Sequence, residues 1–222
     1  MNYATYIKNF KNRKIPEAME RLLQLSNNLD NLSEDLCYAG IYFSFVEDSD
    51  EYLTLLLGYE SQLVESILGI ATNGAGDLLA FWVYDDRDLE DAPIVFVGHE
   101  GDACVMANNF SELLPLLVSS GDLHPDNIPE HLNEFNEFDG DSILGKITLK
   151  MEEDGFYSPG TLQELIERRE ETKIEQADFA TRLGIQLPEN PAELMRTAIE
   201  AHPNFEEWLN HQISIENPDY FN

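Results

Sequence analysis

Basic residues are scarce in this chain of 222 residues: 13 Lys and Arg stand against 43 Asp and Glu, which gives a formal net charge of −30. Within residues 22–144 the single basic residue is Arg87, against 25 acidic residues, so this stretch alone carries a net charge of −24. Proteins that bind nucleic acid or anionic membrane surfaces neutralise phosphates with Lys and Arg. The charge therefore argues against both kinds of partner and favours a basic protein.

Cysteine and long apolar runs are also scarce. Only Cys37 and Cys104 are present, each in an apolar stretch, and we expect both to be buried and reduced. No apolar run approaches the roughly 18 residues of a membrane-spanning helix. Residues 1–6 lack the apolar segment and small-residue cleavage site of a signal peptide. These features predict a soluble cytoplasmic protein, and the 43% of hydrophobic residues are ample for a buried core.

Residues 70–118 contain the clearest structural pattern. Turns with glycines at 73–77 and 98–101 separate short apolar runs. These runs predict neighbouring antiparallel strands at 78–84, 93–97 and 102–107. A helix is expected to follow at about 111–118, capped by Asn109 or Ser111.

The flanking segments are expected to be mostly helical. Before the sheet, a helix is predicted from residues 15–17, ended by the polar residues 27–31, and a strand at 41–46. Residues 52–57 fit a strand or a short helix equally well. After the sheet we expect a long surface segment at 121–145, one more strand at 147–151, and then the helices 161–183, 191–201 and 204–212.

These elements predict an α+β fold, a curved and mainly antiparallel sheet flanked by helices, with a helical C-terminal extension. The predicted domain organisation is an α+β domain over residues 1–150 and an extension over residues 151–222 that packs on it.

Two nucleotide-related motifs are incomplete. The run from Gly74 to Leu79 begins like a dinucleotide fingerprint, but its third glycine is missing and a strand follows it. Residues 176–185 resemble the opening helix of a helix-turn-helix, yet the next residues are acidic and interrupted by prolines instead of forming a basic reading helix. We reject both interpretations.

The candidate partner-binding surface is the acidic loop between the first two strands of the block. It contains Asp85, Asp86, Asp88, Glu90 and Asp91. A calcium loop needs oxygen ligands at defined steps and a glycine at the sharp bend, and this loop has no glycine. We therefore expect no bound metal here, and expect the loop to project away from the core.

Catalytic signatures are not found. The histidines lack metal-binding spacing, and the chain has no nucleophile elbow, Cys/His signature or P-loop. The sequence therefore predicts a binding protein without cofactor or catalytic residues, and leaves its oligomeric state open.

The block from Ile70 to Leu117 resembles the SUKH superfamily of Smi/Knr-type proteins. The residues that carry the resemblance are Ile70-Ala71-x-Asn73-Gly74-x-Gly76-Asp77, Phe81-Trp82, the run from Pro93 to Gly101, and Ala107-x-Asn109-Phe110. The resemblance implies a curved antiparallel sheet with flanking helices, turn roles for glycines 74, 76, 98 and 101, and a core role for Trp82. It also implies a protein without shared catalytic residues.

Many bacterial SUKH proteins look like immunity proteins that neutralise toxins, often nucleases, while fungal relatives are signalling scaffolds. A nuclease needs a basic surface, which an acidic inhibitor can occupy by imitating nucleic acid. The expected function is therefore binding of a basic, nuclease-type toxin. The alternatives are a housekeeping scaffold or regulator with an endogenous partner, and an acidic surface that only keeps the protein in solution.

Overall fold

An antiparallel sheet forms the centre of the computed structural model, which describes residues 1–26, 28–38, 41–42, 44–120 and 143–220. Its five strands follow one another in the order β1-β2-β3-β4-β5, and every neighbouring pair is antiparallel. The strands are β1 (Ser44–Phe45), β2 (Ile67–Thr72), β3 (Leu78–Trp82), β4 (Ile94–Val97) and β5 (Ala103–Ala107). The predicted α+β class and the antiparallel order of the three strands after residue 77 are confirmed.

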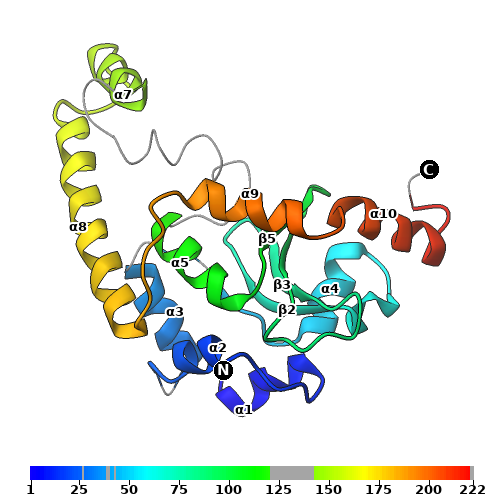
Figure 1. Cartoon of the computed structure of the whole chain (residues 1–222). Helices are drawn as coiled ribbons and strands as arrows, with labels where there is room; N and C mark the ends of the chain where they lie inside the picture. Colours follow the sequence, from blue (N-terminus) through cyan, green and yellow to red (C-terminus); the bar gives the residue numbers. More distant parts are fainter. Residues whose placement is uncertain (27, 39–40, 43, 121–142, 221–222) are drawn as a thin grey trace.

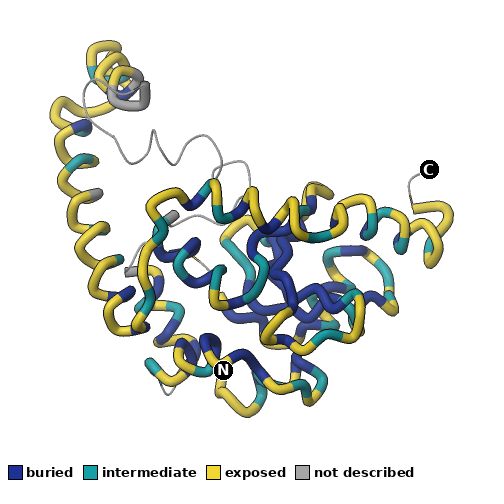
Figure 2. The backbone as a smooth tube through the Cα atoms, in the orientation of Figure 1, coloured by how far each residue is buried: buried dark blue, intermediate teal, exposed yellow. Residues whose placement is uncertain are grey.

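Both faces of the sheet are buried, as the strand sequences require. In β3, Leu79 and Phe81 face one hydrophobic cluster, whereas Leu78, Ala80 and Trp82 face the other. This alternation follows from the two-residue period of a strand, and it explains why β3 is apolar without interruption. The strands are the most deeply buried part of the chain (Figure 2).

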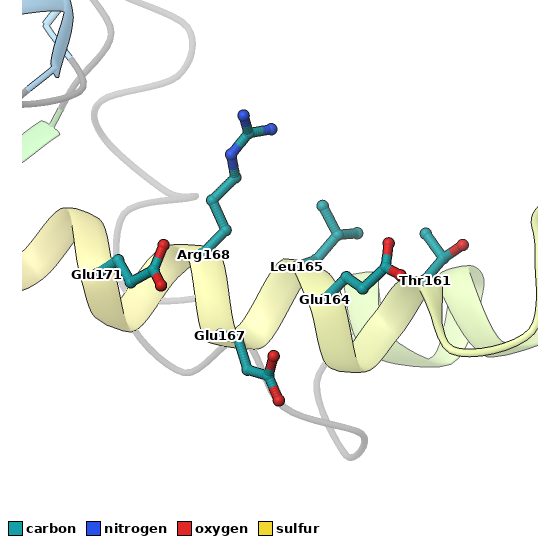
Figure 3. Close-up of a pocket in the computed structure, with 6 residues that line it drawn as sticks. All are labelled: Thr161, Glu164, Leu165, Glu167, Arg168 and Glu171. Carbon is teal, nitrogen blue, oxygen red and sulfur yellow. The ribbon is translucent and has the colours of Figure 1, made fainter.

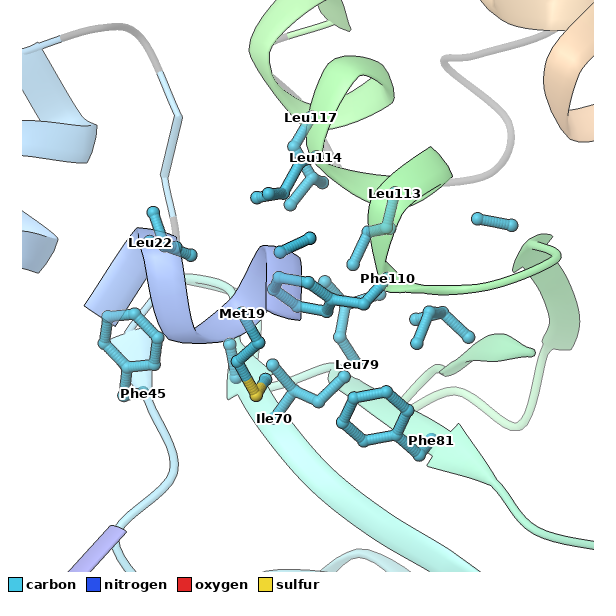
Figure 4. Packing of buried hydrophobic residues seen from close by; sticks show 14 of the residues in the cluster. Met19, Leu22, Phe45, Ile70, Leu79, Phe81, Phe110, Leu113, Leu114 and Leu117 are labelled. Carbon is cyan, nitrogen blue, oxygen red and sulfur yellow. The ribbon is translucent and has the colours of Figure 1, made fainter. Parts of the chain in front are cut away.

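The first face is covered by the N-terminal helices and by α5. These elements are α1 (Tyr3–Tyr6), the 3₁₀ turn η1 (Ile7–Phe10), α2 (Glu17–Leu23), α3 (Leu29–Tyr38) and α5 (Phe110–Ser120). Met19 and Leu22 of α2 belong to the same hydrophobic cluster as the leucines of α5 and Ile70 of β2 (Figure 4). Asn109 accepts a hydrogen bond from the Glu112 N–H at 3.0 Å, so Asn109 caps α5, one of the two predicted caps.

The second face is covered by α4 (Ser49–Leu57), the 3₁₀ turn η2 (Gln62–Glu65) and α10 (Phe205–Glu216). Helix α9 (Pro191–Ala201) lies along β5, and its Met195 and Ala198 belong to different hydrophobic clusters. It therefore shields the β5 edge of the sheet, where unpaired backbone groups would otherwise be open to another chain. Figure 1 shows α9 and α10 running across the sheet one after the other.

The remaining helices point away from the sheet. Helix α8 (Thr161–Leu183) packs on the first cluster only through its last turns, by Phe179, Ala180 and Leu183. Its preceding turns extend outward to α7 (Ile143–Glu153) and are mostly exposed (Figures 1 and 2). Gly184 ends α8 with φ of +66°, and the predicted helices 161–183, 191–201 and 204–212 are all present.

Two predicted strands differ from the structure. Residues 147–151 were expected to be a strand, but they lie inside helix α7. Their β-forming residues are too few to decide between strand and helix by periodicity, and β propensity depends strongly on context. Of the strand expected at 41–46, the residues that the structure describes form only β1, which pairs Ser44 with Thr72.

The polar residues Asn28, Asp30 and Asn31 lie at the start of a helix instead of ending one. Asn28 accepts a hydrogen bond from the Asp30 N–H at 2.8 Å and thereby caps α3, which the sequence had not predicted. Residues 52–57, left open between strand and helix, are helical. Asp48 caps α4 by accepting hydrogen bonds from the N–H groups of Asp50 and Glu51, both at 3.0 Å.

Cys37 and Cys104 are not joined in a disulfide, and the expectation that both are buried is wrong. Cys37 is exposed because α3 buries Leu29, Leu32 and Leu36, and the next residue turns away from that face. Cys104 is half-buried in the edge strand β5.

None of the described helices is long and apolar enough to span a membrane. The division of the chain at residue 150 into a domain and an extension stays a prediction. Residues 121–142 of the expected surface segment lie outside the described part of the chain.

Candidate functional site

The acidic loop connects β3 to β4, and all five of its carboxylates are exposed. They belong to Asp85, Asp86, Asp88, Glu90 and Asp91. Leu89 and Ala92, in contrast, are fully buried in the first cluster. The loop was expected to project away from the core, but Leu89 anchors it to the body of the protein. The structure thus holds the backbone of the loop in place while its carboxylates face solvent.

Arg87 organises the first half of the loop. Its guanidinium donates to the Asp85 carboxylate, lies 4.2 Å from the centre of the Tyr84 ring, and donates to the Asp91 carbonyl at 3.3 Å. The hydrogen bonds from Arg87 lower the pKa of Asp85, chiefly through the side-chain contact. The single arginine of the acidic stretch therefore neutralises Asp85.

Two residues of the N-terminal segment, Arg13 and Glu17, tie the loop to it. Arg13 donates to the Arg87 carbonyl at 3.2 Å and lies 4.0 Å from the Asp86 carboxylate. Glu90 accepts a hydrogen bond at 3.1 Å from the Glu17 N–H, the first amide of α2. Glu90 thus supplies the side-chain cap that Pro16 cannot give to this helix. Asp88 and Asp91 form no ion pair within the described residues, so their charges are available to a partner.

The turns that carry the family motifs are joined by a buried carboxylate. Asp77 is 3% exposed and accepts hydrogen bonds from the His99 N–H at 3.0 Å, His99 Nδ1 at 2.7 Å and Asn73 Nδ2 at 2.7 Å. It thereby links the β2–β3 turn to the β4–β5 turn. Sequence reasoning missed this pair because nothing marks two residues 22 positions apart as neighbours.

The hydrogen bonds shift both members of this pair toward their charged forms. Hydrogen bonding to Asp77 raises the pKa of His99. Burial alone raises the pKa of Asp77, but hydrogen bonds from the His99 side chain and backbone and from Asn73 outweigh it, so the pKa of Asp77 is lowered. The arrangement acts as a clamp between the two turns.

A second histidine joins the C-terminal helices to the sheet. His202, between α9 and α10, lies 3.2 Å from the Tyr84 hydroxyl through Nδ1 and 3.1 Å from Asn108 Oδ1 through Nε2. Burial lowers the pKa of His202, and the nearby charge of Arg87 acts in the same direction. A neutral imidazole satisfies both contacts by accepting from Tyr84 and donating to Asn108.

The glycines and the tryptophan of the motif lie where the resemblance implied. Gly76 and Gly101 have φ of +92° and +98°, which side-chain-bearing residues rarely adopt. At Gly98 a Cβ atom would lie 2.0 Å from Asp102 Oδ1. Trp82 is fully buried in the second cluster, 4.9 Å from the ring of Phe205.

A hollow of about 350 Å³ along α8 does not form a converging site. Its lining residues are Thr161, Glu164, Leu165, Glu167, Arg168 and Glu171. All belong to one helix, and Glu167 points to the opposite side from Leu165 and Arg168 (Figure 3). Within the part of the chain that the structure describes, no three His, Cys, Asp or Glu residues gather where they could hold a metal ion.

Comparison with known proteins identifies the domain. The family model described as SMI1 / KNR4 family (SUKH-1) matches residues 6–115, which contain the sheet, α2 to α4, the first half of α5, the acidic loop and both motif turns. Searches of curated proteins and of solved structures find no significant match. Proteins of the SUKH family are generally immunity-like, typically non-catalytic, and act on protein partners. This chain belongs to the SUKH superfamily.

Proposed function

We propose that this protein is a non-catalytic binding module that neutralises a basic, nuclease-type toxin in the cytoplasm. The observation that carries the proposal is the exposed acidic loop of a SUKH domain, in a stretch of chain with a net charge of −24. A nuclease grips phosphates with Lys and Arg, so a surface of fixed carboxylates can take the place of its substrate.

The loop geometry indicates which carboxylates would face the toxin. Asp85 is neutralised by Arg87, and Glu90 caps α2. The outward charge is carried by the other three acids. Asp88 and Asp91 form no ion pair in the described structure, and Asp86 has only a long contact of 4.0 Å with Arg13. Because Leu89 anchors the loop, little conformational entropy is lost when a partner binds to it.

The proposal is tested on the partner itself. A pull-down from the native host followed by mass spectrometry identifies the partner, and stopped-flow measurements then give its association rate at several salt concentrations. Replacing the five acids with Asn or Gln should slow association and flatten its salt dependence, because charges at the rim of an interface mainly steer the encounter and are screened by salt. A Gln at position 90 keeps a side-chain oxygen that can accept the hydrogen bond by which Glu90 caps α2.

A matched control removes five acids elsewhere. Glu164, Glu167, Glu170, Glu171 and Glu175 are exposed on α8, and their change to Gln alters the net charge equally. This control should reduce the association rate much less. Two results would show that the loop only keeps the protein in solution. One is a partner without basic character, such as a housekeeping protein. The other is a loop variant that associates like the unmodified protein.

A further inference from the structure

A groove of about 550 Å³ lies between the N-terminal segment and α4, on a different part of the domain from the acidic loop. Thr5 lies on one side of it. The residues preceding and opening α4 supply the rest of the lining, namely Val46, Glu47, Asp48, Glu51, Tyr52 and Leu55. Three of these side chains are carboxylates and none is basic.

The base of the groove is fixed by buried polar contacts. Asn9, which is 8% exposed, donates to the Val46 carbonyl at 2.9 Å and accepts from the Ser49 N–H at 3.3 Å. Ser49, 1% exposed, accepts from the Gly69 N–H at 2.6 Å. Tyr52 donates to the Gly76 carbonyl at 2.8 Å. The groove is therefore preformed, and binding would require little ordering of its walls.

The carboxylates of the groove have different roles. Asp48 is occupied as the cap of α4, and Asp50 beside the groove pairs with Lys11. Glu47 and Glu51 are exposed and form no ion pair within the described residues. They leave two negative charges at the rim that no cation of the described chain neutralises.

An apolar side chain lies beside these charges. Leu55 is 76% exposed, although it belongs to a helix whose other face packs on the sheet. Lysine and arginine side chains combine an apolar stem with a charged head, so they match a groove that offers Leu55 and Tyr52 together with two carboxylates.

We propose that this groove binds a lysine or arginine side chain of the basic protein partner and anchors the complex that the acidic loop steers. The proposal rests on the proposed function for the identity of the partner. The two surfaces differ in their effect, since an anchor that is partly desolvated mainly slows dissociation, whereas the loop mainly speeds association.

The groove can be tested without the natural partner. The probe is a blocked tetrapeptide of alternating leucine and arginine, compared with the same peptide carrying citrulline, which is the neutral counterpart of arginine. Titration of the full isotope-labelled chain by NMR should shift the amides of residues 46–55 with the arginine peptide and much less with the citrulline peptide. In Glu47→Gln/Glu51→Gln the affinity should fall about fivefold, because each partly exposed charge pair contributes a factor of about two to five.

Two further variants make the result specific. Asp88→Asn/Asp91→Asn removes the same charge from the acidic loop and should leave peptide binding within a factor of about two, since the loop is a separate surface. Leu55→Ser should weaken binding while keeping its salt dependence, because it removes only the apolar contact. Thermal melting checks that each variant is folded.

The proposed role of the groove is wrong if the arginine peptide causes no localised shift at residues 46–55. It is also wrong if Asp88→Asn/Asp91→Asn weakens peptide binding as much as Glu47→Gln/Glu51→Gln. Equal weakening would mean that the peptide responds only to the overall charge. The proposed function fails separately, through a partner that is not basic or a loop variant with an unchanged association rate, whatever the peptide does.

Discussion

At the scale of single residues, buried polar side chains hold together segments that are distant in sequence. Asp77 joins two hairpin turns through His99, and Ser49 joins α4 to β2 through the Gly69 amide. Each of these groups is satisfied, which offsets the cost of burying it. Such contacts specify one arrangement of the strands and helices among the many that hydrophobic burial alone would allow.

The Asp77–His99 pair predicts a pH-dependent stability. The pKa of His99 is raised in the folded protein. Its contribution to stability is therefore complete below about pH 6.5 and is lost as the pH rises through the pKa that His99 has in the folded protein. The pKa of Asp77 is lowered in the folded protein. Its contribution to stability is therefore complete above about pH 4 and is lost as the pH falls through the pKa that Asp77 has in the folded protein. The stability lost in His99→Gln should therefore be greatest near pH 5 and smaller at pH 8.

Urea unfolding at both pH values measures this difference. His211→Gln, at an exposed position of α10, is the control for a general effect of removing a histidine. A stability loss in His99→Gln that is the same at pH 5 and pH 8 would mean that the pair does not titrate with folding.

Gly69 and Gly74 should respond oppositely to alanine. A Cβ atom at Gly69 would lie 3.0 Å from the Ser49 Oγ and 3.3 Å from a methyl of Leu78, both in the packed interior. Gly69→Ala should destabilise the protein by about 1–3 kcal/mol because these neighbours must shift. At Gly74 a Cβ meets nothing within 4 Å and φ is not positive, so Gly74→Ala should be neutral or stabilise by up to about 1 kcal/mol. Chemical denaturation distinguishes the two, and equal effects would contradict the packing described at Gly69.

At the scale of elements, the C-terminal helices complete a core that the family domain begins. Phe205, Leu209 and Ile213 of α10 pack on the same sheet face as Trp82, although the family match ends at residue 115. His202 adds polar contacts to Tyr84 and Asn108 at the junction of α9 and α10. Without these helices the sheet would expose an apolar face of a kind that soluble proteins rarely leave open.

Phe205→Ala tests the contribution of α10 to the core. Phe205 is 2% exposed and lies 4.9 Å from Trp82, so its truncation should destabilise the protein by about 3–5 kcal/mol. Ile215→Ala, on the same helix at 61% exposure, should change stability by no more than about 0.5 kcal/mol. Similar values for the two variants would mean that α10 does not pack on the sheet as described.

At the scale of the whole molecule, the net charge of −30 opposes the compact state. The ion pairs described are mostly on the surface, where each contributes little to stability, so they do not offset the mutual repulsion of the carboxylates. The same charge that would attract a basic toxin therefore costs stability. So many surface carboxylates are compatible with the fold because both sheet faces are buried beneath helices.

Salt should stabilise this protein. Raising NaCl from 0.01 to 0.15 M shortens the Debye length from about 30 to about 8 Å and screens the repulsion. The melting temperature should rise by about 2–4 °C, which corresponds to ~1 kcal/mol for a chain of this size. Calorimetry at constant pH measures the change, and the salt is kept low enough to limit ion-specific effects. A melting temperature that falls with salt would mean that attractive ion pairs outweigh repulsion.

The sequence by itself determined the elements whose signals are local. Short apolar runs bounded by glycine turns and by the acidic loop identified β3, β4 and β5, and Gly184 identified the end of α8, because these signals lie in a few neighbouring residues. Asp48 with Glu51 three residues later is a capping pattern that could also have identified α4 as a helix. The acidic loop was located correctly from its charge and its position between two strands.

Only the tertiary structure decided what depends on distant contacts. It placed the buried Leu89 beneath the acidic loop, joined Asp77 to His99, and laid α10 on Trp82. Residues 147–151 are helical because their few β-forming side chains have a weak, context-dependent preference that does not fix a strand. The first three share one physical reason: burial and hydrogen bonding link residues far apart along the chain, and they outweigh local propensities of a few tenths of a kcal/mol.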